Sequence, residues 1–341
     1  MKRKVAKLVA PKKFEIFEEP VPALGENDLL VKILAVGLCH SDMPAYHGES
    51  NIGQAKDGSF FMDTNLKFPL EVGHEPVGVV EDVGKGVKNY KPGEYVGGLM
   101  MPCFASHVIT NPGMIVKIPP AVKEPKFCLA EPLMCIVNIV RAANPEFGDY
   151  VAVIGCGMMG LLSLAGVAKS GAREVIGIDL VDSRLDWAKK MGATKTINPK
   201  KGNAVAQIKE ITNGHGVDVA IEITGKIAGM GLAADIIRDA AMFGYQGRGK
   251  ILLPSLYSGK QVWESSYGYQ LMFKSPILHS THPWYSQDYW EDMRRGIWGY
   301  VNGSLPLNKL ITHEFKLEDI GKGFETAETG ADNYIKGIVV P

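Results

Sequence analysis

The sequence predicts an α/β protein in which a doubly wound parallel sheet is inserted into a β-rich domain. Three observations carry this prediction. Residues 1 to about 130 contain short apolar runs separated by turn residues. Between about 132 and 281, apolar strands alternate with helical segments. A glycine motif at 155–160 joins one of these strands to a helix. At 341 residues, the chain is long enough for two domains.

The first region reads as a barrel-like β domain. Apolar runs at Asp28–Gly37 and Pro76–Val83 have the length of strands, and glycine-rich turns such as 83–86 separate them. Tyr95 and Val96 begin another strand after a Pro-Gly turn. Many glycines at strand ends favour a tightly folded, barrel-like domain over residues 1–131.

The second region, 132–281, has β-α-β periodicity. Tyr150–Ile154 is an uncharged apolar run, as expected for a parallel strand that is buried on both faces. Strands alternating with helices predict an open, doubly wound parallel sheet. The further strands are expected at Glu174–Asp179, Val217–Ile223 and Lys250–Pro254, and the helices at Met158–Ser170, Ser183–Met191 and Ala228–Arg238.

The tail, 282–341, is expected to return to the first domain. Helices are predicted at Gln287–Asn302 and Leu317–Thr329, and a strand at Asn333–Val340. The polar, glycine-rich segment Glu49–Lys67 has two interpretations of equal weight. It is a solvent loop with a small apolar plug, or it is a lid or subunit contact near a metal site.

Composition limits the class of ligand. Lys plus Arg and Asp plus Glu both number 37, so no net field favours nucleic acid or an anionic membrane. No window reaches the apolar length of a membrane span, and the basic start Met1–Lys4 is not followed by a signal-peptide core. The five widely spaced cysteines favour a reducing, cytoplasmic setting over a disulfide framework. We therefore expect a small-molecule ligand.

The run Gly155-Cys156-Gly157-Met158-Met159-Gly160 is a dinucleotide fingerprint in its proper setting, between a strand and a helix. Gly155 permits the sharp turn, Gly157 lets the backbone approach a pyrophosphate, and Gly160 allows close packing of helix on strand. The helix that begins at Met158 and Met159 presents free N–H groups to phosphates. A lone glycine triplet is more often a simple tight turn, but the strand, the helix and a following acid favour a cofactor site.

That acid is Asp179, which closes the second strand of the region. A carboxylate there accepts hydrogen bonds from the adenosine ribose and repels a 2′-phosphate, so NAD is favoured over NADP. Arg184 argues the other way, because an arginine near this point holds a 2′-phosphate in some proteins.

A second set of residues has the chemistry of a catalytic zinc site. Cys39 supplies a thiolate and His74 an imidazole, while Glu75 and Glu131 are candidate carboxylate ligands. Asp42 is expected to accept the other ring N–H of the histidine and fix its tautomer. Taken singly, each residue has a simpler explanation: a small core cysteine, a buried histidine, an acid at a helix start. Spacing alone does not exclude these explanations.

The order of the motifs is similar to that of the zinc-dependent medium-chain alcohol dehydrogenase superfamily. The motifs are Gly-x-Cys-His-Ser-Asp at 37–42, Gly-His-Glu at 73–75, Ala-Glu-Pro-Leu at 130–133 and the glycine triplet. The resemblance covers essentially the whole chain and implies a GroES-like catalytic domain (1–131 and 282–341) with an inserted NAD-binding Rossmann domain (132–281). The Glu131-Pro132 pair resembles the polyol and sugar branch, which includes sorbitol, threonine and glucose dehydrogenases.

The resemblance implies a role for each matching residue. Cys39 and His74 match zinc ligands, Glu131 matches the third ligand position, and Glu75 matches a residue that ligates in some members. Ser41 matches the hydroxyl that relays the substrate proton. His40 and Lys336 match positions that contact the cofactor pyrophosphate.

The chain also departs from the family pattern. The four-cysteine structural zinc lobe is absent, which predicts one metal ion per chain. Pro44 stands where many members carry the histidine that ends the proton relay, so either His47 or water is expected to end it. The longer segment between Cys39 and His74 changes the expected shape of the pocket mouth.

The implied reaction is zinc-dependent oxidation of a secondary alcohol with hydride transfer to NAD. A polyol, cyclitol or sugar is the first expectation for the substrate. A threonine-type amino alcohol, or an NADP-dependent reductase acting on a carbonyl, is the alternative. The two ligand motifs disfavour a zinc-free quinone or enoyl reductase. A non-catalytic NAD-binding protein would keep the glycines and need no metal ligands, and the metal content of the pure protein, followed by NAD reduction with a polyol panel, separates it from an enzyme. His282, Trp284 and Tyr285 either line the cleft or, more simply, pack at a domain junction.

The resemblance also implies a homo-oligomer, a dimer or a tetramer. In such dehydrogenases an edge of the parallel sheet commonly joins subunits, and Lys250–Pro254 is expected near that edge.

Overall fold

The computed structural model describes residues 1–54, 60–239, 249–257, 259–281 and 286–341. The chain divides into two compact units. Unit 1 comprises Met1–Leu133, Met293–Val301 and Leu307–Pro341, and unit 2 comprises Met134–Asp292 and Asn302–Pro306. The candidates His282, Trp284 and Tyr285 lie outside the described residues.

Unit 1 is built on a seven-stranded, mostly antiparallel sheet. Its strands run in the order β16-β17-β3-β6-β7-β9, and β8 also pairs with β3. The bounds are β3 Leu29–Gly37, β6 Pro76–Val83, β7 Tyr95–Gly98, β8 His107–Thr110, β9 Ile115–Lys117, β16 Ile311–Lys316 and β17 Lys336–Val340. The expected β-rich domain is therefore confirmed, and its last two strands come from the C-terminal tail.

The core of unit 1 forms where a helix packs on this sheet. Helix α9 (Ile320–Thr329) buries Ile320, Phe324 and Ala327, which share one face at helical spacing. Phe324 lies against the ring of Phe104, and both side chains are almost fully buried. The helix ends at Gly330, whose φ of +66° is the left-handed conformation that a helix cap favours. This apolar contact joins the tail to the first 133 residues.

Two hairpins flank the sheet of unit 1. One is formed by β1 (Lys2–Ala10) and β2 (Lys13–Pro20), and the other by β4 (Asn51–Gln54) and β5 (Phe60–Asp63). The second hairpin lies in the segment 49–67, for which the sequence predicted a solvent loop or a lid or subunit contact, and no strands. Between the hairpins in sequence, the short helix α1 (Met43–His47) follows β3.

Unit 2 contains the predicted parallel sheet. Its six strands run in the order β12-β11-β10-β13-β14-β15, so the connection changes direction between β10 and β13. β10 is buried at every residue, as the uncharged run predicted. The bounds are β10 Tyr150–Ile154, β11 Glu174–Ile178, β12 Lys195–Ile197, β13 Val219–Glu222, β14 Lys250–Leu253 and β15 Ile277–Ser280.

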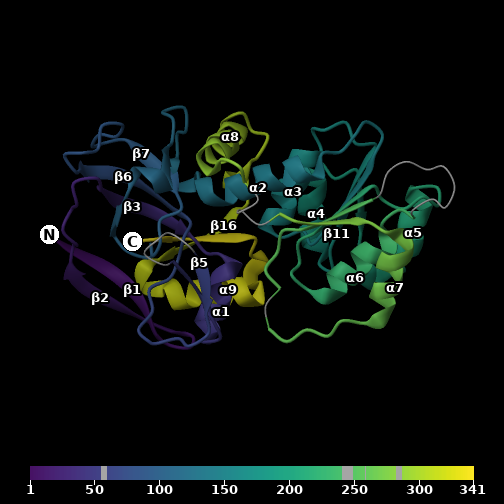
Figure 1. The fold of residues 1–341 in the computed structure, drawn as a ribbon, viewed down its shortest axis with the longest axis horizontal. Helices are drawn as coiled ribbons and strands as arrows, with labels where there is room; N and C mark the ends of the chain where they lie inside the picture. The colour runs from purple at the N-terminus through teal and green to yellow at the C-terminus, as the bar shows by residue number, and fades with distance from the viewer. Residues whose placement is uncertain (55–59, 240–248, 258, 282–285) are drawn as a thin grey trace. The chain divides into compact units, whose positions relative to one another are not determined.

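Helices cover both faces of this sheet (Figure 1). α3 and α4 pack together on one face, and α5, α6 and α7 form a row on the other. The bounds are α3 Met158–Val167, α4 Asp182–Lys190, α5 Ala204–Ile211, α6 Ile227–Ile236 and α7 Ser265–Lys274. The short strands β12 and β15 and the helices α5 and α7 were not predicted. Because β15 forms the edge of the sheet, β14 lies one strand inside it.

Two longer helices contain the points where the units divide. α2 (Ala130–Ala143) contains the division after Leu133, and α8 (Tyr289–Val301) contains the division after Asp292. None of the helices in the described part of the chain combines the length and the apolar character needed to cross a bilayer.

Candidate active site

The register of the unit 1 sheet brings the predicted metal ligands together. In the antiparallel pair β3–β6, Val36 lies opposite Pro76. Cys39 follows the end of β3, and His74 and Glu75 precede the start of β6, so the two motifs meet at the same end of the pair. The Cys39 thiol, a His74 ring nitrogen and a Glu75 oxygen all lie within 4.8 Å of one another.

Two glycines make this approach possible. A Cβ on Gly37 would lie 1.9 Å from Glu75 Oε2, so the carboxylate occupies the space that a side chain would need. Gly73 has a φ of +96°, and a Cβ there would also meet the ring of Phe104 at 2.6 Å. Both positions therefore require glycine for a steric reason, which explains the glycines of the two motifs.

Hydrogen bonds orient the imidazole of His74. Its Nδ1 lies 3.2 Å from Asp42 Oδ1, which confirms the predicted partner. Donation from Nδ1–H to this carboxylate leaves the Nε2 lone pair free to bind a metal. Nε2 lies 3.2 Å from the Ser41 hydroxyl, and that hydroxyl also lies 3.2 Å from the Cys39 sulfur. Ser41 thus lies between two side chains of the ligand group, which consists of Cys39, His74 and Glu75.

The charge of His74 depends on the ionisable side chains beside it. Burial opposes a positive charge on His74, but the acidic groups of Asp42 and Cys39 outweigh it and hold the histidine pKa well above its usual value. The second oxygen of Asp42 is buried and has no hydrogen-bond partner among the described residues. A buried carboxylate beside a thiol and an imidazole is an environment that favours a cation. The donor set of sulfur, nitrogen and oxygen fits zinc.

Lys336 completes the charged cluster from the start of β17. β17 pairs antiparallel with β3, and Ile338 lies opposite Gly37, so Lys336 lies beside the end of β3. Its ammonium donates to Glu75 Oε2 at 2.5 Å and to the Leu38 carbonyl at 2.9 Å. Lys336 and Glu75 are 3% and 1% exposed. Burial opposes the charge of the lysine, but Glu75 raises the pKa of Lys336 above its usual value.

Three other predicted residues of unit 1 lie outside the ligand group. Glu131 is buried in the first turn of α2 and is not among the three residues whose ligand atoms converge. His40 is exposed in the short 3₁₀ helix that follows Cys39. His47 lies 2.8 Å from Glu328 through its Nε2. Their roles as zinc ligand, cofactor contact and relay end remain predictions, as does the pyrophosphate contact of Lys336.

The glycine motif of unit 2 has the conformation that the fingerprint predicts. Gly155 has a φ of +99°, directly after β10. A Cβ on Gly160 would lie 1.8 Å from the Gly155 carbonyl oxygen, so helix α3 packs closely on the turn. A Cβ on Gly157 would meet no atom of the described residues within 4 Å, although Gly157 caps the N-terminus of α3. This open backbone beside free helix N–H groups fits a pyrophosphate. Of the two methionines, Met158 is buried and Met159 is half-buried.

Asp179 braces this loop. One of its carboxylate oxygens accepts the N–H of Cys156 at 2.7 Å, and the other accepts the N–H of Val181 at 2.9 Å. Each oxygen retains a lone pair for a ribose hydroxyl. Arg184 follows in the first turns of α4 and is half-buried. The fit to a nicotinamide dinucleotide is therefore good, and both residues that bear on the 2′ position are present.

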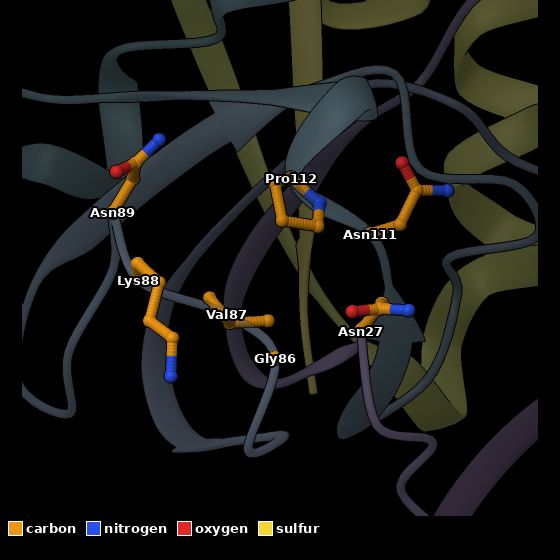
Figure 2. A pocket seen from close by; sticks show the side chains of 7 residues that line it. All are labelled: Asn27, Gly86, Val87, Lys88, Asn89, Asn111 and Pro112. Atoms are coloured by element: carbon orange, nitrogen blue, oxygen red, sulfur yellow. The ribbon is translucent and has the colours of Figure 1, made fainter.

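A surface hollow of unit 1 has no such chemistry. It is lined by Asn27, Gly86, Val87, Lys88, Asn89, Asn111 and Pro112. Figure 2 shows amide side chains at its rim and a lysine beside it. None of the residues of the candidate metal centre lines it, and it offers neither an acid nor a thiol. We assign no function to this hollow.

Sequence reasoning missed two features near the predicted sites. One is the pairing of Lys336 with Glu75. The other is Glu222, a fully buried acid at the end of β13. An acid that ends an otherwise apolar strand was a visible signal, because burying a carboxylate requires donors that satisfy it.

Comparisons with known proteins agree with both units. Residues 25–120 match the family model described as alcohol dehydrogenase GroES-like domain, and residues 159–270 match the model described as zinc-binding dehydrogenase. The L-threonine 3-dehydrogenase of Bacillus subtilis (strain 168) is 30% identical, over 92% of this chain and 91% of that protein. The L-threonine 3-dehydrogenase of Shewanella baltica (strain OS185) is 25% identical, over 96% of each chain.

Solved structures share the fold. The 2R,3R-butanediol dehydrogenase from Bacillus subtilis superimposes with a TM-score of 0.81 at 24% identity, over 99% of each chain. A protein from Sinorhizobium meliloti 1021, whose structure is bound to NADP, gives 0.80 at 22% identity over 100% of each chain.

Proposed function

Because the chain belongs to the zinc-dependent medium-chain dehydrogenase superfamily, we propose that it oxidises a secondary alcohol of a polyol, cyclitol or sugar and transfers the hydride to NAD. That it is an NAD(P)-dependent dehydrogenase follows from the family; the substrate class and the choice of NAD are the proposal. The observation that carries it is the convergence of Cys39, His74 and Glu75 within 4.8 Å beside the hydroxyl of Ser41.

The residues of unit 1 would hold the metal and move the proton. Cys39, His74 and Glu75 are the proposed zinc ligands, with Glu131 as a further candidate. A zinc ion bound there supplies a Lewis acid that lowers the pKa of the substrate hydroxyl. Ser41 accepts the hydroxyl proton and passes it on, which its position between the thiol and the imidazole supports. Asp42 keeps the ring of His74 in the ligand tautomer.

The residues of unit 2 would bind the cofactor. Gly157 and the N-terminus of α3 are proposed to hold the pyrophosphate, and Asp179 the adenosine ribose. The carboxylate of Asp179 favours NAD, because a 2′-phosphate beside it would be repelled. Arg184 supports the opposite preference, as does the similar solved structure from Sinorhizobium meliloti 1021, which is bound to NADP.

A second candidate substrate is an amino alcohol of the threonine type. The names of the curated relatives favour it, since L-threonine 3-dehydrogenases match over nine-tenths of the chain. Both candidates carry a secondary alcohol next to a second polar group. A panel of polyols, cyclitols, sugars and L-threonine, assayed at 340 nm with NAD and with NADP, separates them. A preference for L-threonine would overturn the first candidate, and no reduction of either cofactor would overturn both.

We also propose that the protein assembles as a homo-oligomer through unit 2. Helix α7 and the edge strand β15 expose large apolar side chains, among them Met272, Phe273 and Leu278, which are 61%, 72% and 47% exposed. Within the described residues β15 has no strand on its outer side, and an edge strand with apolar side chains is suited to pairing with a second copy. Light scattering of the native protein and of L278E tests this proposal, and a monomeric wild type would refute it.

A further inference from the structure

A buried acid lies directly beneath the glycine loop of unit 2. Glu222 is the last residue of β13 and is 0% exposed. In the parallel pair β10–β13 it lies opposite Ile154, the residue before Gly155. Glu222 therefore lies at the carboxyl ends of the parallel strands, where the glycine loop follows β10. A carboxyl group in an apolar sheet requires compensating donors, and its presence needs an explanation.

Hydrogen bonds from Thr224 and Tyr257 satisfy both oxygens of Glu222. Oε1 accepts the backbone N–H of Thr224 at 2.8 Å and also a short hydrogen bond from the Thr224 hydroxyl. Oε2 accepts a short hydrogen bond from the Tyr257 hydroxyl. Tyr257 lies in the segment after β14, so the carboxyl group joins the loops that follow two neighbouring strands. Burial and Glu222 both raise the pKa of Tyr257, which keeps its hydroxyl a donor.

The loop held by Glu222 supports the first glycine of the fingerprint. A Cβ on Gly155 would lie 2.9 Å from the Thr224 methyl group and 3.3 Å from its backbone nitrogen. The Thr224 hydroxyl, in turn, accepts the N–H of Lys226 at 3.0 Å. The turn at Gly155, which directs the backbone toward the pyrophosphate, thus rests on a residue whose side chain and N–H are both fixed by Glu222.

The packing leaves the carboxyl group little freedom. A Cβ on Gly229, in the first turn of α6, would lie 2.4 Å from Glu222 Oε1 and 2.5 Å from the Thr224 hydroxyl. Gln261 accepts the N–H of Ile227 at 2.7 Å and donates to the Gly225 carbonyl at 3.0 Å. The loop after β13 is therefore held on one side by the acid and on the other by the segment after β14.

We propose that Glu222 is a positioning residue for the nicotinamide dinucleotide: with Tyr257 it fixes Thr224 against Gly155 and so sets the affinity for the cofactor. The inference rests on the proposed cofactor chemistry of unit 2 and extends it to residues outside the fingerprint. An amide at position 222 replaces one of the two acceptor oxygens by an NH2 donor, so it cannot accept from Thr224 on one side and from Tyr257 on the other as the carboxyl group does.

The test measures binding of NADH and NADPH to the intact protein by fluorescence, together with thermal unfolding. E222Q is expected to weaken binding of the preferred cofactor about tenfold, the effect of one lost buried hydrogen bond to the loop. Y257F keeps the acid and removes one donor, and we expect a loss of about fivefold. In turnover, the KM for the cofactor rises in both variants while kcat changes little.

Asp218→Asn is the matched control. Asp218 immediately precedes β13, at the end of the strand opposite to Glu222. There it accepts a hydrogen bond from the N–H of Tyr150 and forms an ion pair with Arg238. The D218N variant loses comparable polar contacts of a carboxylate, and none of them involves the glycine loop. We expect D218N to lower the melting temperature as E222Q does and to leave cofactor binding within twofold of the wild type.

Each outcome decides between explanations. Cofactor affinity of E222Q and Y257F within twofold of the wild type would overturn the positioning role. Equal weakening in D218N would also overturn it, because the effect would then be general softening of the unit. If E222Q does not fold, Y257F decides alone. A wild type that binds neither NADH nor NADPH would instead overturn the proposed function, and the inference with it.

Discussion

Replacing Lys336 by methionine tests the charge arrangement of the metal centre. Methionine fills a similar volume with an apolar chain but removes the ammonium that lies 2.5 Å from Glu75 Oε2. The Glu75 carboxylate is 1% exposed, so water cannot take the place of the lost partner. The Leu38 carbonyl also loses a donor. K336M therefore leaves a buried negative charge without its direct counter-charge.

The expected cost follows from this burial. Removing one partner of a buried ion pair costs about 3–5 kcal/mol in the free energy of unfolding. That is a large part of the ~5–15 kcal/mol that stabilises a typical domain. In the double variant K336M/E75Q no charge is left unpaired, so we expect it to be more stable than K336M alone. The two substitutions are thus strongly non-additive.

Adding zinc tests whether Glu75 is a metal ligand. If Glu75 is a ligand, a bound cation replaces the lost ammonium, and saturating zinc stabilises K336M more than it stabilises the wild type. Urea unfolding of the metal-free and zinc-loaded proteins, followed by tryptophan fluorescence, measures both effects. A metal-free K336M within about 1 kcal/mol of the wild type would refute the reasoning, because the pair would then not be buried as described.

Three further predictions concern the two sites. Gly157→Ala is expected to keep wild-type stability, because the added Cβ meets open space, but to lose most dinucleotide binding. Gly160→Ala is expected to unfold more easily. Calorimetry and NADH titration of the two variants test this. A thiol reagent is expected to modify Cys39 rapidly in the native metal-free protein and the four buried thiols only after unfolding, with zinc protecting Cys39; several fast thiols would contradict this. Below the raised pKa of His74, zinc affinity is expected to fall about tenfold per pH unit, because zinc must displace the proton that the histidine binds in acid. Chelator competition measures this affinity. An affinity that does not change with pH would exclude the histidine as a ligand.

Local features of the sequence were predicted well because their physical causes are local. The buried strand Tyr150–Ile154 and the turn at Gly155 depend on neighbouring residues, and both appear as predicted. The hydrogen bond between Asp42 and His74, 32 residues apart, was expected from the chemistry of a metal-binding histidine and not from local structure. Short elements escaped prediction. The strand β12 has three residues, too few for any apolar alternation to be visible.

Long-range features depended on register, which the sequence does not display. Cys39 and His74 meet because Val36 pairs with Pro76, and no spacing rule reveals that pairing. Lys336 is 261 residues from Glu75, and its ion pair follows from a strand that returns from the tail. The resemblance supplied the residues, whereas the sheet shows why they meet.

X-ray absorption at the zinc edge, on the purified protein with its zinc content measured, tests the central claim most directly. We expect one zinc per chain, with a single sulfur ligand at about 2.3 Å and nitrogen or oxygen ligands at about 2.0–2.2 Å, and we expect Cys39→Ser to lose the sulfur shell. A four-sulfur shell, or an unchanged spectrum in Cys39→Ser, would contradict the account.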